Sequence, residues 1–444
     1  MKKFKIVIVG GASTYTPGIV KGLITNNDEL PLKELVLVDI NGERLDIMGG
    51  FVRILMAKYL PDVKVSWTTN REEAFPGTDF FFVQIRPGGL KQREQDEKIP
   101  LKYGLVGQET CGAGGFAFAM RSIPAMVEIV KDAVKYSPEA WILNYSNPES
   151  MISEALNRAV PEAKALCLCD MPISQEVSLA KVLGKGHKDL TFKYFGLNHF
   201  GWFSAIYDKD GKDLLPQLVK DILEGNKNTI DHVDIKTDPY WQETFKGIIK
   251  MTKYFPGFIP LTYLQYYFFP DEMVAKENPE YTRANFVMDH REKEVFEECE
   301  EVIKNSSVSD SSLLTGVHGN YIIDIAKSIA FDKKERFVVN VLNEGAISNF
   351  REDVVVEVPC YVGSQGVEPI AVGKIPTFQK GLMEMEKSYE VLAVEACLEE
   401  DYDKALKALT LNLTIPSAGL AKKVLDELIE NNKEYFPDFK PRYF

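Results

Sequence analysis

The chain has 444 residues, 45% hydrophobic and 26% charged, which is the composition of a folded globular protein long enough for two closely joined domains. It carries 65 acidic against 52 basic residues, and the formal charge of -13 argues against nucleic acid or anionic membranes as partners. Six cysteines without framework spacing, and an N-terminal apolar run too short for a signal peptide, favour a cytoplasmic protein.

The chain opens with a predicted strand over residues 5–9 that leads directly into a glycine-rich loop. Pro17 then marks the first turn of a helix. Such a turn between a strand and a helix lets backbone amides approach a diphosphate, as in dinucleotide-binding folds. Ala12 and Tyr15 stand where the G-x-G-x-x-G fingerprint has its later glycines, so the motif is imperfect. The predicted cofactor contacts in this loop are Gly10, Gly11, Ala12, Ser13 and Thr14.

The second predicted strand, residues 34–38, ends in Asp39. An acidic side chain at this position can bind the adenosine ribose, which favours NAD over NADP. Further strands alternate with helices, as expected for a parallel α/β sheet. These strands are predicted at residues 63–67, 79–85, 140–144 and 163–169. The sequence therefore predicts a doubly wound, Rossmann-like NAD-binding domain of the lactate and malate dehydrogenase type over residues 1–195.

The organisation changes after this point. Two strands are predicted at residues 193–196 and 202–207, and the remaining chain reads as mostly helical. The clearest helical patterns cover residues 281–300, 388–408 and 419–432. We therefore expect residues 196–444 to form an α+β, mostly helical domain that binds substrate and metal and carries an oligomer interface.

Two short motifs contain the candidate metal ligands and the candidate proton donor. Cys169 and Asp170 close an apolar run, and Asn198 and His199 follow the next predicted strand. A thiolate and a neutral imidazole are both strong ligands for transition metals, and Asp170 is suited to moving a proton beside the ion. The alternative is a half-buried cysteine, a helix-capping aspartate and a core histidine.

Several motifs in order resemble glycoside hydrolase family 4, and in particular its 6-phospho-α-glucosidases. They span most of the chain. The matching motifs are Gly10-Gly11-Ala12-Ser13-Thr14, Gly107-Gln108-Glu109-Thr110-Cys111-Gly112, Asn144-Tyr145-Ser146-Asn147-Pro148, Cys169-Asp170-Met171-Pro172, Gly196-Leu197-Asn198-His199-Phe200-Gly201-Trp202, Thr262-Tyr263-Leu264-Gln265, Thr282-Arg283-Ala284-Asn285 and Glu357-Val358-Pro359-Cys360.

The resemblance implies hydrolysis by oxidation and elimination, which needs NAD and a divalent metal. NAD⁺ would take a hydride from sugar C3, Tyr263 would then remove the C2 proton, and Asp170 would protonate the departing C1 oxygen. By the same resemblance Cys169 and His199 hold Mn²⁺. Because a thiolate is a soft ligand for manganese, Co²⁺, Ni²⁺ or Fe²⁺ are alternatives.

The resemblance also implies the substrate. Arg93, Asn147 and Arg283 match the family's phosphosugar contacts, and aspartate after Cys169 is similar to the pattern of α-specific members. We therefore expect a 6-phospho-α-glucoside such as maltose 6′-phosphate, cleaved to glucose 6-phosphate by a homodimer or homotetramer. Without the resemblance, Tyr263 would be a core aromatic residue, and Arg93 and Arg283 would be surface charges.

Other functions stay open. Within the family, the alternatives are a 6-phospho-β-glucosidase and an α-glycosidase for unphosphorylated sugars. Outside it, a 2-hydroxy-acid dehydrogenase would share the dinucleotide domain without needing a metal, and a sugar-phosphate sensor would bind ligands without turnover. The pair of Cys169 and His199 disfavours the dehydrogenase, and the presence of Asp170, Tyr263 and the metal ligands disfavours the sensor.

Overall fold

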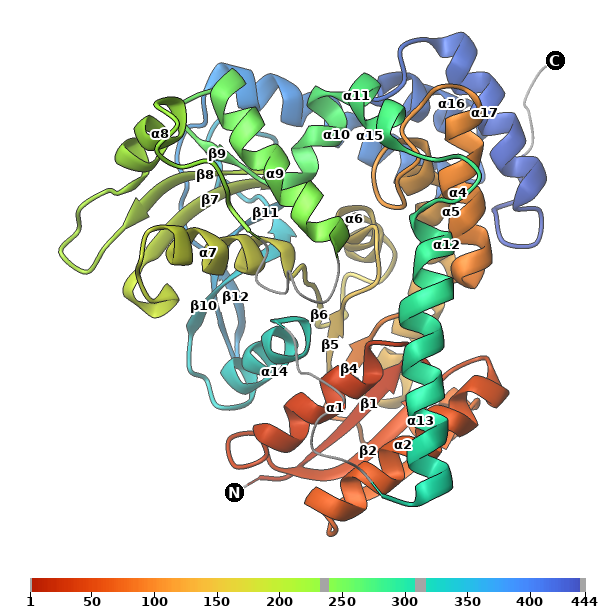
Figure 1. The fold of residues 1–444 in the computed structure, drawn as a ribbon. Helices are drawn as coiled ribbons and strands as arrows, with labels where there is room; N and C mark the ends of the chain where they lie inside the picture. Colours follow the sequence, from red (N-terminus) through yellow and green to blue (C-terminus); the bar gives the residue numbers. More distant parts are fainter. Residues whose placement is uncertain (1, 232–238, 308–316, 440–444) are drawn as a thin grey trace.

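The computed structural model describes residues 2–231, 239–307 and 317–439 (Figure 1). Its N-terminal half contains six parallel strands in the spatial order third, second, first, fourth, fifth, sixth. They are β1 (Phe4–Val9), β2 (Leu32–Val38), β3 (Lys64–Thr68), β4 (Phe80–Val83), β5 (Trp141–Asn144) and β6 (Ala165–Cys167). The strand order reverses direction between β1 and β4, which confirms the predicted Rossmann-like sheet.

Helices cover both faces of this sheet, so its strands read as nearly continuous apolar runs. Ile6 and Ile8 of β1 pack into one core with the first two helices, whereas Val7 and Val9 pack into a second core with the fifth and sixth. The helices of this half are α1 (Thr16–Thr25), α2 (Gly42–Tyr59), α3 (Arg71–Ala74), α4 (Gly89–Lys102), α5 (Gly112–Tyr136), α6 (Glu149–Ala159), α7 (Met171–Val182) and the short η1 (His187–Asp189).

The sheet continues into the second half of the chain. β6 pairs antiparallel with a strand that is distant in sequence, through Cys167 and Asn340. The later strands are β7 (Thr191–Leu197), β8 (Phe200–Tyr207), β9 (Ile259–Pro260), β10 (Glu335–Leu342), β11 (Val355–Gly363) and β12 (Gly366–Pro369). The described residues thus form one 12-stranded sheet in the order β3-β2-β1-β4-β5-β6-β10-β11-β7-β8-β9, with β12 paired to β11.

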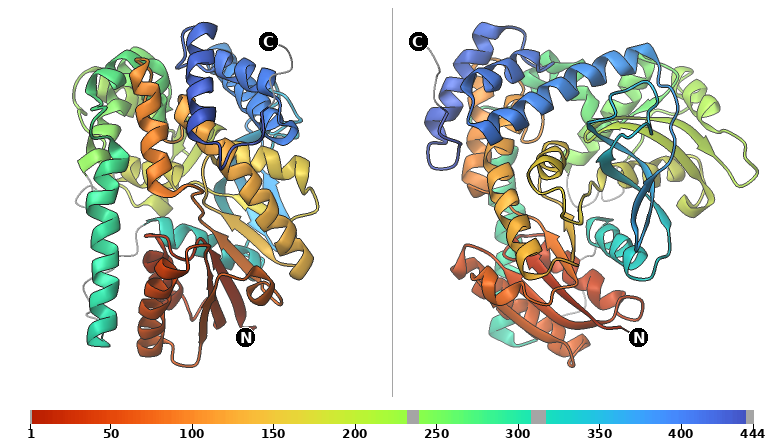
Figure 2. Two further views of the ribbon diagram at one scale, coloured as in Figure 1. Left: turned by 90° about the vertical axis from the view of Figure 1, so that its right-hand side faces the viewer. Right: turned by 180° about the vertical axis from the view of Figure 1, so that it is seen from behind.

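Helices make up most of the remaining second half. They are α8 (Leu215–Leu223), α9 (Pro239–Tyr254), η2 (Thr262–Leu264), α10 (Gln265–Phe268), α11 (Pro270–Lys276), α12 (Arg283–Val287), η3 (Met288–Glu292), α13 (Lys293–Asn305), α14 (Val317–Ala330), α15 (Thr377–Glu399), α16 (Tyr402–Leu411) and α17 (Ala418–Asn431). Figure 2 shows α15 to α17 at the end of the molecule opposite the N-terminal strands.

The structure corrects two details of the sequence analysis. The helix predicted over residues 388–408 is two helices, because Glu400 has a left-handed φ of 57° and the Asp401 side chain caps the next helix by accepting from Lys404 N. The sequence patterns also fail to predict strands β10 and β11. Because β11 is buried along almost its whole length, its apolar run lacks the alternation that identifies a half-buried strand.

One helix of the described chain, α5, is long and apolar enough to cross a membrane by length and composition alone. However, 83% of its most apolar window is buried inside the protein. Phe116 and Ile123 of this helix belong to the second core, against the strands. The apolar character of α5 is therefore explained by its place in the core.

Replacement by alanine should have opposite effects at two helical glycines, one packed against β3 and the other in open space. A Cβ on Gly49 would lie 2.2 Å from the Trp67 ring, so Gly49→Ala should destabilise the protein by about 1–3 kcal/mol. Gly381 lies inside α15 with open space around it, so Gly381→Ala should stabilise by about 0.5–1 kcal/mol. Urea unfolding of both variants measures this. Equal stability of the two would show that Trp67 moves aside at no cost.

Candidate active site

The candidate site lies where the carboxyl ends of the parallel strands meet the turn between β7 and β8. Cys169 follows β6 and is 5% exposed, and His199 lies in the turn and is 6% exposed. Cys169 Sγ and His199 Nε2 are 3.5 Å apart. Two residues that are 30 positions apart in sequence are thus brought together, as the family resemblance implies for a pair of metal ligands.

This pair fits a shared metal ion. Ligand bonds of roughly 2.0–2.3 Å from sulfur and nitrogen are compatible with donor atoms 3.5 Å apart. Burial lowers the pKa of His199 to about 4, so its imidazole is neutral and able to ligate. Burial raises the pKa of the Cys169 thiol, and a bound cation would reverse that by stabilising the thiolate. Among the described residues, no group of three His, Cys, Asp or Glu side chains converges on one point, so Cys169 and His199 are the candidate protein ligands as a pair.

Hydrogen bonds to a carboxylate on another strand hold the turn that carries His199. Asn198 Nδ2 donates to Glu357 Oε1 at 3.0 Å, and Tyr194 Oη donates to Glu357 Oε2 at 2.6 Å. Glu357 is completely buried on β11, and burial raises its pKa to about 7 although both donors oppose that shift. His199 itself has a left-handed φ of 61°, which is unfavourable for a residue with a Cβ. These bonds to Glu357 stabilise the turn in that conformation.

Tyr263 lies directly against the candidate metal ligand. Its ring stacks on His199 with centroids 4.1 Å apart and an angle of 5° between the planes. The Trp241 ring packs edge-on against Tyr263, with centroids 6.4 Å apart. Burial raises the pKa of the phenol well above its ordinary value, so a nearby cation is needed before Tyr263 can act as a base at neutral pH. Tyr263 is buried, but it lines the site as well as the core.

Asp170 is the residue immediately before α7, and it is partly exposed. Its carbonyl oxygen accepts from Ser174 N at 2.9 Å in the first turn of that helix. The Asp170 charge contributes an upward influence on the pKa of both Cys169 and His199. Asp170 therefore lies close to the candidate metal pair.

A cluster of buried charges lies beside these groups. Arg93 is 5% exposed, so its interpretation as a surface charge is wrong. Its Nη1 lies 2.9 Å from Glu109 Oε2, and Arg86 Nη1 lies 2.8 Å from the same oxygen. Burial would raise the pKa of Glu109, but the two guanidinium groups outweigh it and lower that pKa to about 2. Arg93 Nε also contacts Glu97 Oε1 at 2.8 Å.

The predicted residues Arg93, Tyr263 and Arg283 line a single pocket. Arg283, the first residue of α12, stacks on the Tyr240 ring with its Cζ 4.5 Å from the centroid. The full lining is Tyr15, Arg93, Gln108, Glu109, Tyr240, Trp241, Tyr263, Arg283, Val287 and Arg291. The lining carries more basic than acidic side chains, which suits an anionic ligand in an otherwise acidic protein.

Asn147, the third predicted substrate residue, lies between β5 and α6. It is joined to Pro148 by a cis peptide bond. Its Oδ1 is buried and has no hydrogen-bond partner among the described residues, which leaves an acceptor for a ligand hydroxyl group. The His318 side chain, which the sequence leaves open as a site neighbour, lies outside the described residues.

The glycine-rich loop fits a dinucleotide. Gly10 has a φ of 80°, and a Cβ there would lie 2.3 Å from the Gln84 carbonyl oxygen. The amide of Ala12 donates to Asp39 Oδ2 at 3.0 Å, which ties the loop to the end of β2. The next helix, α1, begins at Thr16 without a side-chain cap, and its positive end suits a diphosphate, although the Thr16 amide donates to Ser13 O at 3.0 Å and Pro17 has no amide hydrogen. The loop residues Ser13 and Thr14 are partly exposed.

Sequence reasoning assigned no role to several residues of the site. Glu357 carried a usable signal, because a carboxylate within the apolar run of β11 predicts a buried and partnered group. Arg86 follows β4, at the strand edge where ligands bind. Tyr240 and Arg291 carried no such signal, since nothing local distinguishes them from surface residues.

Loss of the Glu357 carboxylate should weaken metal binding. In Glu357→Gln the amide cannot accept from both Tyr194 and Asn198, so the turn holding His199 loosens and affinity should fall roughly 10- to 100-fold. Titration with Co²⁺, followed by cobalt–thiolate absorbance, measures this affinity. Glu335→Gln is the control, because it makes the same charge change at an exposed end of β10. Unchanged Co²⁺ affinity in Glu357→Gln would contradict the positioning role.

Comparisons with known proteins identify the family of this chain. The chain matches the family model described as Family 4 glycosyl hydrolase over residues 5–185 and the Family 4 glycosyl hydrolase C-terminal domain over residues 194–415. Maltose-6'-phosphate glucosidase MalH of Clostridium acetobutylicum is 48% identical over 439 residues, which cover 99% of this chain and 100% of that protein.

Solved structures of related enzymes also match almost the whole chain. A 6-phospho-alpha-glucosidase from gut microorganisms, in complex with NAD and Mn²⁺, has a TM-score of 0.96 and 44% identity, and the match covers 99% of this chain and 100% of the other. A second such enzyme, in complex with NAD and glucose-6-phosphate, has a TM-score of 0.95 and 41% identity with the same coverage. On its sequence, its fold and the two matching family models, this chain belongs to glycosyl hydrolase family 4.

Proposed function

We propose that this family 4 enzyme hydrolyses 6-phospho-α-glucosides, such as maltose 6′-phosphate, and releases glucose 6-phosphate with the help of NAD and Mn²⁺. The single observation that carries this proposal is the contact between the candidate metal pair and the candidate base. Cys169 and His199 are 3.5 Å apart, and Tyr263 stacks on His199 beside an arginine-lined pocket. The names and bound molecules of the similar proteins support the same activity.

Each group of the site is assigned one part of the reaction. NAD⁺, held by the glycine-rich loop and Asp39, would supply an acceptor for the sugar C3 hydride and return it, and a Mn²⁺ ion held by Cys169 and His199 would supply the charge that polarises the sugar oxygens. Tyr263 removes the C2 proton that oxidation at C3 has made acidic. Asp170, next to the candidate metal ligand Cys169, protonates the glycosidic oxygen as it leaves C1. Water then adds at C1 while a proton returns to C2, which completes the hydrolysis once the hydride has returned to C3. Manganese is the metal found with a similar structure, and Co²⁺, Ni²⁺ and Fe²⁺ stay alternatives for this chain.

The phosphate of the substrate is assigned to Arg93 and Arg283. Both guanidinium groups line the pocket that also contains Tyr263. A guanidinium group makes strong, directional hydrogen bonds to phosphate oxygens, and burial strengthens them. Asn147 is assigned to a sugar hydroxyl group because its buried Oδ1 has no partner within the described residues.

The cofactor residues are Gly10, Gly11, Ala12, Ser13 and Thr14 for the diphosphate and Asp39 for the adenosine ribose. We divide the chain functionally at residue 195, with NAD bound by residues 1–195 and the sugar and metal bound by residues 196–444 together with Arg93, Asn147 and Cys169 of the first half. A cytoplasmic location is supported by the six cysteines, which are all unpaired thiols.

A homodimer or homotetramer is supported by a surface cluster of aromatic side chains. Tyr254 is 63% exposed and Phe378 is 45% exposed. Phe255 contacts both, and it stacks on Phe378 with ring centroids 5.2 Å apart. A second copy of the chain would remove this apolar surface from water.

Substrate choice tests the proposed function. We expect release of nitrophenol from p-nitrophenyl α-D-glucoside 6-phosphate, which carries the phosphate assigned to Arg93 and Arg283. The β anomer and the unphosphorylated α compound should react much more slowly. Activity should be lost with a chelator or without NAD⁺, and no net NADH should accumulate. Activity confined to either comparison substrate would correct the specificity, and no activity on any of them would favour a dehydrogenase or a sensor.

The acid role of Asp170 predicts a dependence on the leaving group. Asp170→Asn should lower kcat/KM for maltose 6′-phosphate by roughly 100- to 10,000-fold, because its sugar leaving group needs a proton. The loss should be far smaller for the nitrophenyl substrate, whose leaving group departs as an anion. Steady-state kinetics with both substrates on one preparation make each substrate the control for the other. Equal losses would remove Asp170 from the acid role.

A further inference from the structure

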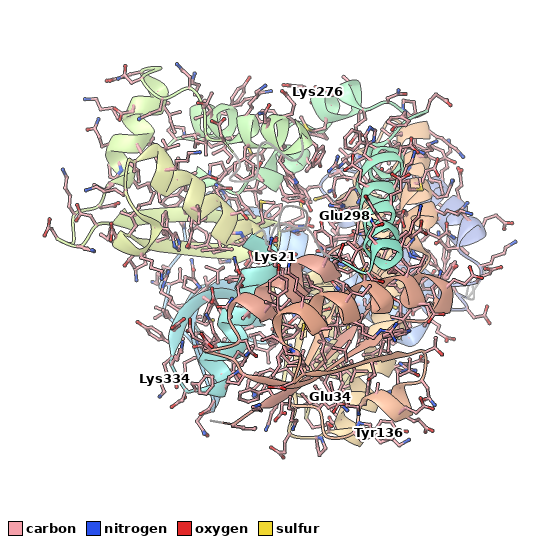
Figure 3. The ribbon with its side chains drawn as sticks, turned by 60° about the horizontal axis from the view of Figure 1, so that its bottom comes forward. Lys21, Glu34, Tyr136, Lys276, Glu298 and Lys334 are labelled. Atoms are coloured by element: carbon pink, nitrogen blue, oxygen red, sulfur yellow. The ribbon has the colours of Figure 1, made fainter. Side chains whose placement is uncertain are left out.

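A continuous helical rod connects the sugar pocket to the nucleotide-binding layer. It consists of α12, η3 and α13 in succession, and it runs along one side of the molecule (Figures 1 and 2). Arg283, at its start, lines the pocket. Its far end, α13, packs against α2 of the N-terminal half, and Figure 3 shows Glu298 of this helix beside Lys21 of α1.

The middle of the rod is a π-helical turn. One side chain of that turn contacts the glycine-rich region directly, and the next reaches it only through Arg44. Arg291 Nη1 donates to Tyr15 Oη at 2.8 Å, and its Cζ lies 4.7 Å from the centroid of the Tyr15 ring. Glu292 pairs with Arg44, which also donates to Ala12 O at 3.5 Å. A π-helical turn contains one residue more than an α-helical turn, which changes the direction of the side chains that follow. Such turns are frequent at functional sites.

Arg291 has hydrogen-bonding capacity that the described residues do not use. Its Nε is buried and has no hydrogen-bond partner among them. It lines the pocket together with Arg93 and Arg283, and Glu109, the carboxylate of that lining, already contacts Arg86 and Arg93. The positive charge here exceeds the negative charge, so an anionic ligand would stabilise the arrangement.

The contacts of Arg291 indicate which of two phosphate-bearing ligands it binds, NAD or the phosphorylated sugar. Its contact residue Tyr15 directly precedes α1, whose uncapped N-terminus faces the diphosphate in dinucleotide-binding folds. Arg93 is held instead by Glu97 and Glu109, neither of which belongs to that loop. Arg291 shares the pocket with Arg93 and Arg283, but its own hydrogen bond is to Tyr15 beside the glycine-rich loop, which favours the cofactor diphosphate over the sugar phosphate.

We propose that Arg291, held on Tyr15 by the π-helical turn, binds the diphosphate of the dinucleotide, so that the C-terminal half completes the cofactor site of the N-terminal half. This inference rests on the proposed use of NAD. A guanidinium group is suited to the task because it donates two parallel hydrogen bonds to phosphate oxygens.

Calorimetric titration of the full-length protein with three ligands tests the inference. The ligands are NAD⁺, ADP-ribose, which keeps the diphosphate but lacks nicotinamide, and adenosine, which lacks both phosphates and is measured by displacement of NADH. Arg291→Met should weaken NAD⁺ and ADP-ribose by similar factors, roughly 10- to 100-fold, because hydrogen bonds to a charged group are lost. Adenosine and glucose 6-phosphate should bind as they do to the unaltered protein.

Two further variants control the experiment. Lys293→Met removes a positive charge from an exposed position two residues along the same rod, and it should change none of these affinities. Tyr15→Phe removes only the hydroxyl group that Arg291 contacts, so it should weaken ADP-ribose by a smaller factor and tests the inference even if Arg291→Met folds poorly.

Three results would overturn the inference. They are unchanged ADP-ribose affinity in both Arg291→Met and Tyr15→Phe, an equal loss for adenosine, and a loss confined to glucose 6-phosphate, which would assign Arg291 to the sugar. If the unaltered protein fails to bind NAD⁺, the proposed function fails as well. If the unaltered protein binds NAD⁺ and both variants bind it with the same affinity, only the role proposed for Arg291 is wrong.

Discussion

The site depends on one continuous sheet. Because β10 and β11 lie between β6 and β7, the strand that ends before Cys169 and the turn that carries His199 belong to the same rigid layer. Glu357 of β11 then binds the side chains of Tyr194 and Asn198 and fixes that turn. The distance between the two candidate metal ligands is therefore set by the pairing of strands from both halves, which a flexible connection between domains could not do.

Electrostatics in the site follow from burial. Removing the thiol of Cys169, the imidazole of His199 and the phenol of Tyr263 from water disfavours the charged form of each, so all three are neutral until a ligand brings charge. The pocket beside them has the opposite character, because guanidinium groups hold Glu109 ionised and still leave positive charge in excess. A divalent cation suits the first environment and a phosphate group suits the second, and the reaction proposed for this chain uses both.

Local sequence was sufficient for the N-terminal half. The strands predicted from apolar runs and the glycine-rich loop match β1 to β6 closely, because each strand is short and, apart from the edge strand β3, mostly buried. The second half was harder. The run that forms β11 has no alternation, and the break between α15 and α16 depends on a left-handed Glu400 and a capping Asp401 within an otherwise helical pattern.

The sequence by itself determined the fold class of the first half and, through ordered motifs, the family and the residue types of the chemistry. The three-dimensional structure alone decided which residues meet. Cys167 pairs with Asn340, Arg86 and Arg93 share Glu109, and Arg291 contacts Tyr15, although most of these partners are separated by long stretches of chain. The hydrophobic periodicity of a sequence indicates only which residues of one helix or strand are buried. These contacts arise from pairing and packing between distant elements, which no local pattern encodes.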